Sequence, residues 1–256
     1  MPRLVSFVIP TLMEDEIGRS LARLGEHLAR VRGYDFELLL ADDSPDSYKG
    51  LLDEAVAELT SRFARDRGSG PELTARRVDG PRRGKGAALK AGILASRGDF
   101  VFTMDADLPI PLENIDRFLR ILDDEGADLV VAERPFNRNL SEPARFVASR
   151  VLYALVRLVV FQSATFDDTQ CGFKAFRGSL LRGLAREQIV DGGMVDIEYL
   201  YAALRAGARA RCVGVQPDPE TRASKIDVRR AMMRDPIDLV RIKVRGFRGG
   251  YDAKPR

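Results

Sequence analysis

The sequence is poor in the residue types that support several common chemistries. Its 256 residues include two cysteines, one histidine and no tryptophan. Cys171 and Cys212 are too few for a disulfide framework and lack the spacing of a zinc site, so a reducing compartment is the simplest setting. The histidine, His27, lies in a stretch with helical periodicity, far in sequence from every polar cluster. Ser-His-Asp and Cys-His mechanisms therefore have no candidate base.

Long hydrophobic runs are also missing. The longest apolar stretch, residues 151–161, is interrupted by Arg157 and falls far short of the roughly 20 residues that a bilayer requires. The first residues, MPRLVSFVIPT, enter a strand pattern directly, without the apolar segment and cleavage site of a signal peptide. We therefore expect no spanning helix and a cytoplasmic location, with peripheral contact at the cytoplasmic membrane face left open.

The charge is nearly balanced overall but uneven along the chain. A net charge of +3 results from 41 basic and 38 acidic residues, which argues against a protein built to coat nucleic acid. Residues 227–256 hold nine Lys or Arg and four Asp, a local +5, which leaves about −2 for residues 1–226. We therefore expect a folded domain over 1–226 and a basic helical tail over 227–256. The tail is either a solvated terminus or a contact to anionic lipid.

An apolar fraction of 45% is enough for a complete core, and its pattern indicates an α/β fold. The runs LVSFVIP and FELLLAD are typical of strands, and between them apolar residues recur on one helical face across residues 17–31. Further strands are predicted at 73–78, 99–105, 128–132, 172–177 and 209–215, and helices near 47–65, 85–96, 112–124 and 194–206. Strands separated by helices predict one domain with a mainly parallel central sheet and helices on both faces.

Polar residues follow three of the predicted strands at the point where each strand ends. They are Pro10 and Thr11 with Glu14 just beyond, Asp42 and Asp43 in the next run, and Asp105 and Asp107 after GDFVFTM. Because ligands bind at the carboxyl ends of strands in such sheets, we expect these residues to converge on one edge.

The aspartates of the sequence DAD, Asp105 and Asp107, fit a divalent-cation site. Hard oxygen ligands at a strand end hold Mg²⁺ or Mn²⁺ and leave open positions for a diphosphate, whose charge the ion neutralises. The competing interpretation is a cap for the helix near residue 112. The pair Asp42 and Asp43 favours a nucleotide site, because carboxylates accept hydrogen bonds from base and ribose. Taken alone, DDSP is more typical of a turn than of a nucleotide site.

Two further segments carry charged residues of interest. RRGKGAALK, which contains Lys85, places glycines and cations at a predicted helix start, where phosphate binds well, although it is not a P-loop. In GGMVDIEYL, Asp196 and Glu198 are the candidate general bases. A charge pair favoured by the helix dipole is the equal alternative for these two carboxylates.

In their order along the chain, these motifs resemble the family 2 inverting glycosyltransferases of the Rossmann-like GT-A fold, and among them the dolichyl-phosphate mannose and glucose synthases. VIPTLMEDE is similar to the family's opening nucleotide-binding strand, ADDSPDS to its base-binding motif, GKGAALKAGILASRGDFVFTMDADL to its central signature and DDTQCGFKAFR to its acceptor-side signature. The resemblance covers residues 4–225. It implies a GT-A domain over 1–226 and transfer of a hexose from GDP-mannose or UDP-glucose to a polyprenyl or dolichyl phosphate.

The resemblance also implies roles for individual residues. Asp105 and Asp107 would hold Mg²⁺ or Mn²⁺ and act in catalysis. The nucleotide would be bound by Pro10, Thr11, Glu14, Asp42, Asp43 and Asp105, with Lys85 from the helix start, and the acceptor phosphate by Arg134, Arg145, Ser149, Arg222 and Lys225. Arginine suits the second task because it binds phosphate through two parallel hydrogen bonds.

The acceptor decides whether a general base is needed. A phosphate oxygen is already anionic at neutral pH, whereas a hydroxyl acceptor requires a catalytic carboxylate, for which Glu198 is chosen and Asp196 is the other candidate. Pro109 stands where relatives often have a polar metal ligand, and the C-terminal membrane helices of many relatives are missing. A soluble glycosyltransferase with a small-molecule acceptor and a non-catalytic protein that binds nucleotide sugars are therefore the alternative hypotheses.

Overall fold

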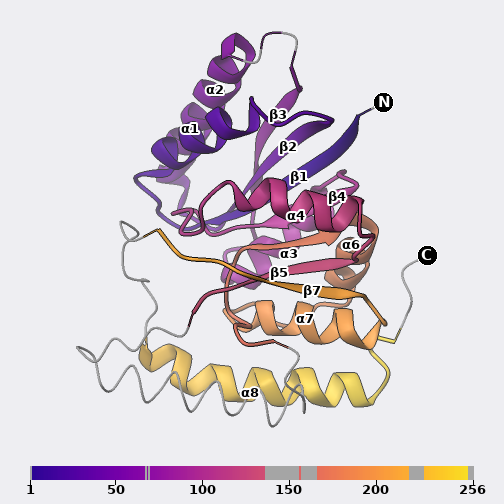
Figure 1. Cartoon of the computed structure of the whole chain (residues 1–256). Coiled ribbons are helices and arrows are strands. Elements are labelled where there is room, and N and C mark those ends of the chain that lie inside the picture. Colours follow the sequence, from indigo (N-terminus) through magenta and orange to yellow (C-terminus); the bar gives the residue numbers. More distant parts are fainter. Residues whose placement is uncertain are drawn as a thin grey trace.

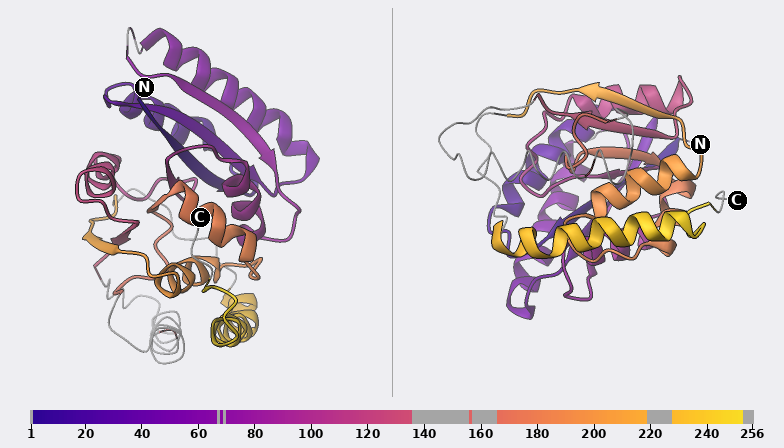
Figure 2. Two further views of the ribbon diagram at one scale, coloured as in Figure 1. Left: turned by 90° about the vertical axis from the view of Figure 1, so that its right-hand side faces the viewer. Right: turned by 90° about the horizontal axis from the view of Figure 1, so that it is seen from below.

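The computed structural model describes residues 2–66, 68, 70–135, 156, 166–218 and 228–252. In this part of the chain seven strands form one mixed sheet in the order β3-β2-β1-β4-β6-β5-β7. Helices cover both faces of this sheet (Figure 1, Figure 2). The predicted fold class, a single α/β domain with a mainly parallel central sheet, is confirmed.

The strands lie close to their predicted positions. They are β1 (Arg3–Thr11), β2 (Tyr34–Asp42), β3 (Leu73–Asp79), β4 (Phe100–Thr103), β5 (Leu129–Glu133), β6 (Lys174–Arg177) and β7 (Ala210–Gly214). β1 pairs with β2 and β4, β2 with β3, and β5 with β7, all in parallel. β6 runs antiparallel between β4 and β5. The sequence pattern does not reveal this reversal, because side chains alternate in the same way in both strand directions.

The helices are α1 (Ile17–Leu28), α2 (Lys49–Asp66), α3 (Lys85–Ala95), α4 (Asn114–Asp123), α6 (Gly178–Glu187), α7 (Val195–Arg205) and α8 (Val228–Phe247), with the 3₁₀ helix η1 (Asp46–Tyr48) before α2. The sequence pattern predicts each of them except α6, which follows β6 without a break. α1 ends earlier than predicted, at Leu28, although Val31 is still buried.

Each face of the sheet has its own hydrophobic core. Alternation along β4 sends Phe100 and Phe102 to the face covered by α1, α2 and α4, and Val101 to the face covered by α3, α6 and α7. The ring of Phe102 lies 5.0 Å from that of Phe7, centroid to centroid. Burial of each such side chain contributes roughly 1.5–3 kcal/mol. This packing fixes the strand after which Asp105 emerges.

α8 packs on the second face of the sheet, against α7. Leu239 and Ile242 are buried on its inner side, and so is Tyr251 just beyond the helix. Gly246 lies so close to Tyr201 that a β-carbon there would overlap the ring. Specific contacts therefore join this helix to the body of the domain. Within the described ranges, no helix combines the length and the apolar character that a membrane crossing requires.

Candidate active site

The carboxyl ends of β1, β2 and β4 meet at one edge of the sheet, as the sequence predicts. The parallel register places Thr11 beside Asp42, and Val8 beside Thr103, so the residues that follow these strands emerge next to one another. Pro10 is the second-last residue of β1, Glu14 follows the strand, and both residues are half-buried.

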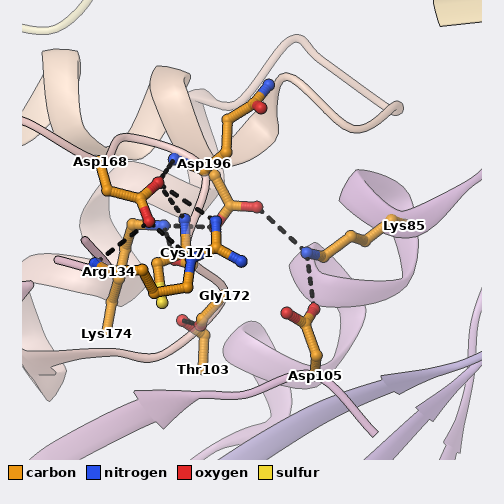
Figure 3. Close-up of polar contacts among 10 residues, drawn as sticks. Lys85, Thr103, Asp105, Arg134, Asp168, Cys171, Gly172, Lys174 and Asp196 are labelled. Atoms are coloured by element: carbon orange, nitrogen blue, oxygen red, sulfur yellow. Dashed lines mark hydrogen bonds and ion pairs between the residues drawn. The ribbon is translucent and has the colours of Figure 1, made fainter. Parts of the chain in front are cut away.

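Asp105, just beyond β4, forms an ion pair with a lysine from α3. Lys85 Nζ lies 2.9 Å from Asp105 Oδ1 and 3.1 Å from Asp196 Oδ2, so the ammonium group bridges two carboxylates (Figure 3). Burial lowers the pKa of Lys85, but the charges of Asp105 and Asp196 outweigh burial and raise the pKa above its ordinary value. Gly172 lies directly against the Asp105 carboxylate, where a β-carbon would overlap it. The position of Asp105 is thus defined from two sides.

Asp107 is exposed and is the second carboxylate of the pair. Partial burial and the negative charge of Asp105 raise its pKa above the ordinary value. A divalent cation between two carboxylates relieves such repulsion. α4 begins at Asn114 and has no side-chain cap, so neither aspartate serves as the cap that was the alternative interpretation. No group of three or more His, Cys, Asp or Glu in the described residues forms a metal site.

A buried ion pair lies behind Lys85. Lys174 Nζ lies 2.7 Å from Asp196 Oδ1 and also donates a hydrogen bond to the carbonyl of Cys171 (Figure 3). The exposed fractions of the two side chains are only 1% for Lys174 and 6% for Asp196. Burial raises the pKa of Asp196, but the two lysines outweigh it and hold the pKa below its ordinary value. Four side chains of alternating charge thus connect the interior to the sheet edge: Lys174, Asp196, Lys85 and Asp105.

Asp42 presents a buried oxygen without a partner. Its Oδ1 accepts hydrogen bonds from the Thr11 hydroxyl, at 3.3 Å, and the Ser44 amide, at 2.9 Å. Its Oδ2 is buried and has no hydrogen-bond partner in the part of the chain that the structure describes. Because buried polar atoms are nearly always paired, this oxygen fits an N–H donor supplied by a ligand.

Asp43 and Asp191 organise the loop before α3. The carboxylate oxygens of Asp43 accept the amides of Arg82 and Gly84, each at 2.7 Å, so this side chain supports the loop. At the start of α3, the carbonyl of Asp191 accepts hydrogen bonds from two backbone amides, that of Gly86 at 2.9 Å and that of Ala87 at 3.2 Å. Two of the backbone amides at this helix start are therefore already paired within the chain, and phosphate binding by this segment stays a prediction.

Arg134 lies at the exit of β5, where an aspartate binds it. Its Nε lies 2.6 Å from Asp168 Oδ2, and its Nη2 lies 3.2 Å from Asp168 Oδ1 (Figure 3). Asp168, which the sequence analysis did not single out, also accepts the amides of Gln170 and Cys171 at 3.1 Å each. The remaining residues predicted to bind the acceptor phosphate, Arg145, Ser149, Arg222 and Lys225, lie outside the described residues.

Glu198 belongs to the scaffold of the domain. Residues 196 and 198 lie roughly 200° apart around α7, since a helix turns about 100° per residue, so their side chains leave opposite sides. Glu198 Oε1 accepts hydrogen bonds from the Ile189 amide, at 2.8 Å, and the Tyr251 hydroxyl, at 2.6 Å. Its Oε2 accepts the Val190 amide at 2.9 Å. These contacts give Glu198 a structural role, in place of the catalytic role expected from the sequence.

Glu198→Gln is expected to lower the free energy of unfolding by about 1–2 kcal/mol. The NH₂ group of the new side-chain amide would face one of the N–H or O–H donors that the carboxylate accepts in the wild type. Turnover per folded molecule should stay close to the wild-type value. Urea unfolding and a transfer assay measure the two quantities. Glu187→Gln, which breaks a half-exposed ion pair with Arg245, is the matched control and should cost less than about 1 kcal/mol. A large loss of turnover at unchanged stability would instead identify Glu198 as a base for a hydroxyl acceptor.

The family model described as "Glycosyl transferase family 2" matches residues 6–171. A dolichyl-phosphate beta-glucosyltransferase of Trichomonas vaginalis is 26% identical over 252 residues, which cover 94% of this chain and 73% of that relative. An undecaprenyl-phosphate 4-deoxy-4-formamido-L-arabinose transferase of Pseudomonas fluorescens is 30% identical over 178 residues, 69% of this chain and 48% of that relative. Among solved structures, glucosyl-3-phosphoglycerate synthase from Mycobacterium tuberculosis with Mn²⁺, uridine diphosphate and glucosyl-3-phosphoglycerate has a TM-score of 0.60 at 21% identity. That alignment covers 93% of this chain and 78% of the synthase, and it shows a shared fold.

Proposed function

Because the chain belongs to glycosyl transferase family 2, we propose that it transfers a hexose from a nucleotide sugar to a polyprenyl phosphate, with inversion at the anomeric carbon. The names of the relatives support the acceptor class, since they specify dolichyl phosphate and undecaprenyl phosphate. GDP-mannose and UDP-glucose are the two donors proposed. Guanine and uracil both present an N–H group to a carboxylate, so Asp42 suits either base.

The observation that carries the proposal is the pairing of two features on one sheet edge. Asp42, the last residue of β2, offers a buried oxygen that has no partner among the described residues, and Asp105 and Asp107 follow β4. β1 lies between these two strands, so the features are separated by two strand spacings, about 10 Å in total. A nucleoside diphosphate has its base and its diphosphate at opposite ends, which suits this separation.

In the proposed reaction, an oxygen of the acceptor phosphate attacks the anomeric carbon while the bond from that carbon to the donor diphosphate breaks. The attacking oxygen is anionic at neutral pH, so the step needs alignment of the two substrates and no general base. Lys85 and Arg134 bring positive charge to the strand ends, which reduces repulsion between the two anions. A hydroxyl acceptor has less support, because the Glu198 carboxylate is hydrogen bonded inside the fold.

Asp105 and Asp107 are the residues that would hold a divalent cation. The Lys85 ammonium lies 2.9 Å from Asp105, so this carboxylate already attracts a positive charge, which supports the proposed site. Carboxylate oxygens suit Mg²⁺ and Mn²⁺ equally. When bound there, such an ion would neutralise charge on the departing diphosphate.

The reaction can be tested with radiolabelled GDP-mannose or UDP-glucose, a polyprenyl phosphate and Mn²⁺. Label should enter a butanol-soluble product that dilute acid cleaves. Label in a water-soluble product alone would overturn the lipid acceptor and favour a small hydroxyl acceptor. Binding of a nucleotide sugar without turnover and without any effect of Mn²⁺ would indicate a non-catalytic protein.

Asp42→Asn is expected to weaken binding of the nucleotide sugar about 10- to 100-fold, because an amide NH₂ in place of Oδ2 would face an N–H of the base. Its remaining oxygen can still accept the hydrogen bonds from Thr11 and Ser44, so thermal stability should change little. Calorimetry with GDP-mannose and UDP-glucose measures the affinity. Asp35→Asn, near the opposite end of β2, is the matched control and should bind like the wild type. If the Asp42 variant and the control bound the nucleotide sugar with equal affinity, the proposal that the base binds at Asp42 would be wrong.

A further inference from the structure

The outer side of α8 carries a stripe of exposed apolar side chains. Ile237, Val240, Val244 and Phe247 are 61%, 55%, 40% and 74% exposed, and they follow one another at intervals of three, four and three residues. Residues with this spacing lie on one side of a helix. These four account for half of the large exposed hydrophobic residues among the described part of the chain. We refer to them as the α8 stripe.

The packing of α8 on the domain does not require the α8 stripe. The inner side of the helix is filled by Leu239 and Ile242, which are buried against the second core, and Tyr251 anchors the end of the segment. From below, α8 lies outermost, and no other described helix or strand covers it (Figure 2, right). A contiguous apolar surface that the fold does not use marks an interaction site.

The charges around the α8 stripe indicate what kind of surface it binds. Between residues 235 and 248, the exposed positions other than the stripe are Pro236, Arg241 and Arg248, and none is acidic. The two aspartates of this stretch, Asp235 and Asp238, are only half-exposed. A helix exposed to water normally mixes acidic and basic residues on its outer side. Arg241 pairs with Asp238 at 2.9 Å, so Arg248 and Lys243 supply the further positive charge beside the apolar groups.

We infer that the α8 stripe docks the enzyme on the surface of an anionic lipid bilayer, with α8 lying in the plane of the interface. Apolar side chains enter the boundary between headgroups and acyl chains, and flanking arginines attract anionic headgroups. The Lys243 ammonium lies 5.1 Å from the centre of the Phe247 ring, so positive charge also adjoins the most exposed apolar residue. The inference deepens the proposed function and rests on it for its purpose, because a polyprenyl phosphate is embedded in a membrane.

The docked helix would be close to the candidate active site. Arg241 of α8 donates to the Ile189 carbonyl at 3.4 Å, and a β-carbon on Gly192 would lie 3.8 Å from Asp238 Oδ2. The same loop supplies the Asp191 carbonyl, which pairs with the amides that open α3. A single loop therefore separates α8 from the helix that carries Lys85. A bilayer at the α8 stripe would lie one layer of structure from the sheet edge that binds the substrates.

The test is co-sedimentation of the whole 256-residue chain with vesicles of phosphatidylcholine alone or mixed equally with phosphatidylglycerol. The wild type should bind the mixed vesicles and bind neutral ones much more weakly. Val240→Ser with Phe247→Ser should reduce binding to the mixed vesicles at least about tenfold. Arg248→Gln should reduce it about fivefold and lower the preference for anionic lipid.

The matched control is Leu51→Ser with Leu94→Ser, since these side chains on α2 and α3 are 40% and 43% exposed. This control should bind vesicles like the wild type, and thermal unfolding should show every variant folded. Equal vesicle binding by the stripe variant and the wild type would overturn the inference. So would a wild-type dimer in light scattering that the stripe variant converts to a monomer, because the stripe would then be an interface between two copies.

A transfer assay with detergent-dispersed acceptor separates the two proposals. The stripe variant should transfer sugar there at the wild-type rate, and should lose activity only toward acceptor in vesicles. If the wild type binds vesicles through the stripe and transfers no sugar to polyprenyl phosphate in either form, the proposed function fails and the docking inference stands.

Discussion

Asp105→Asn is expected to lower the rate of sugar transfer about a thousandfold, which corresponds to about 4 kcal/mol of lost transition-state stabilisation. The reason is that Asp105 would hold the proposed cation, which would neutralise charge on the departing diphosphate, and that Asp105 pairs with Lys85, whose ammonium lies 2.9 Å away. The ion pair is partly exposed, with a third of each side chain accessible, so the change in folding stability should stay within about 1 kcal/mol. Turnover at saturating donor, measured across a titration of Mn²⁺, separates weaker cation binding from slower chemistry.

Asp79→Asn is the matched control for this experiment. Asp79 ends β3 on the same sheet edge, pairs with Arg77 and Lys49, and takes no part in the chain of charges that reaches Asp105. Its substitution should leave turnover and Mn²⁺ binding nearly unchanged. If Asp105→Asn and Asp107→Asn retained both properties as well, a cation site at the end of β4 would be ruled out.

Lys174→Met is expected to lower the free energy of unfolding by about 3–5 kcal/mol near neutral pH, because it leaves a buried carboxylate with too little compensating charge. Lys174 and Asp196 lie 2.7 Å apart and are almost inaccessible to water. Urea unfolding measures the loss. Transfer should also fall, because Asp196 positions Lys85 at 3.1 Å.

The pH dependence of this loss follows from the direction of the Asp196 shift. The folded protein holds the pKa of Asp196 below its ordinary value of 3.8, so this carboxylate favours the folded state above that pH. The difference in stability between the wild type and Lys174→Met should therefore be complete above about pH 5 and shrink as the pH falls further. Adding Asp196→Asn to the variant removes the unpaired charge and should restore most of the lost stability. A double variant as unstable as the single one would show that packing around Lys174, and not charge, causes the loss.

Much of the fold could be predicted because it depends on local order. The alternation of Phe100, Val101 and Phe102 predicts a strand in which successive side chains enter opposite cores, and the structure confirms it. Parallel strands also end at a common edge, so chain order alone predicts that Thr11, Asp42 and Asp105 come together. The antiparallel direction of β6 could not be predicted, because strand periodicity is the same in both directions and carries no information about it.

The partners of the charged groups could not be predicted in the same way. Asp196 and Glu198 are both candidate bases in the sequence, with Glu198 chosen first. In the structure Asp196 meets Lys85 and Lys174, whereas Glu198 accepts the Ile189 and Val190 amides. In the sequence, Lys174 is notable only as a charged residue within the apolar segment FKAF. That position does not indicate which residue pairs with it.

The sequence by itself thus determined the strands, nearly all the helices and the edge at which the polar residues after β1, β2 and β4 gather, because apolar burial repeats with the period of each element. Only the tertiary structure decided which carboxylate binds which cation. The physical reason is that an ion pair joins side chains that are close in space, and Lys85 and Asp196 stand 111 residues apart along the chain.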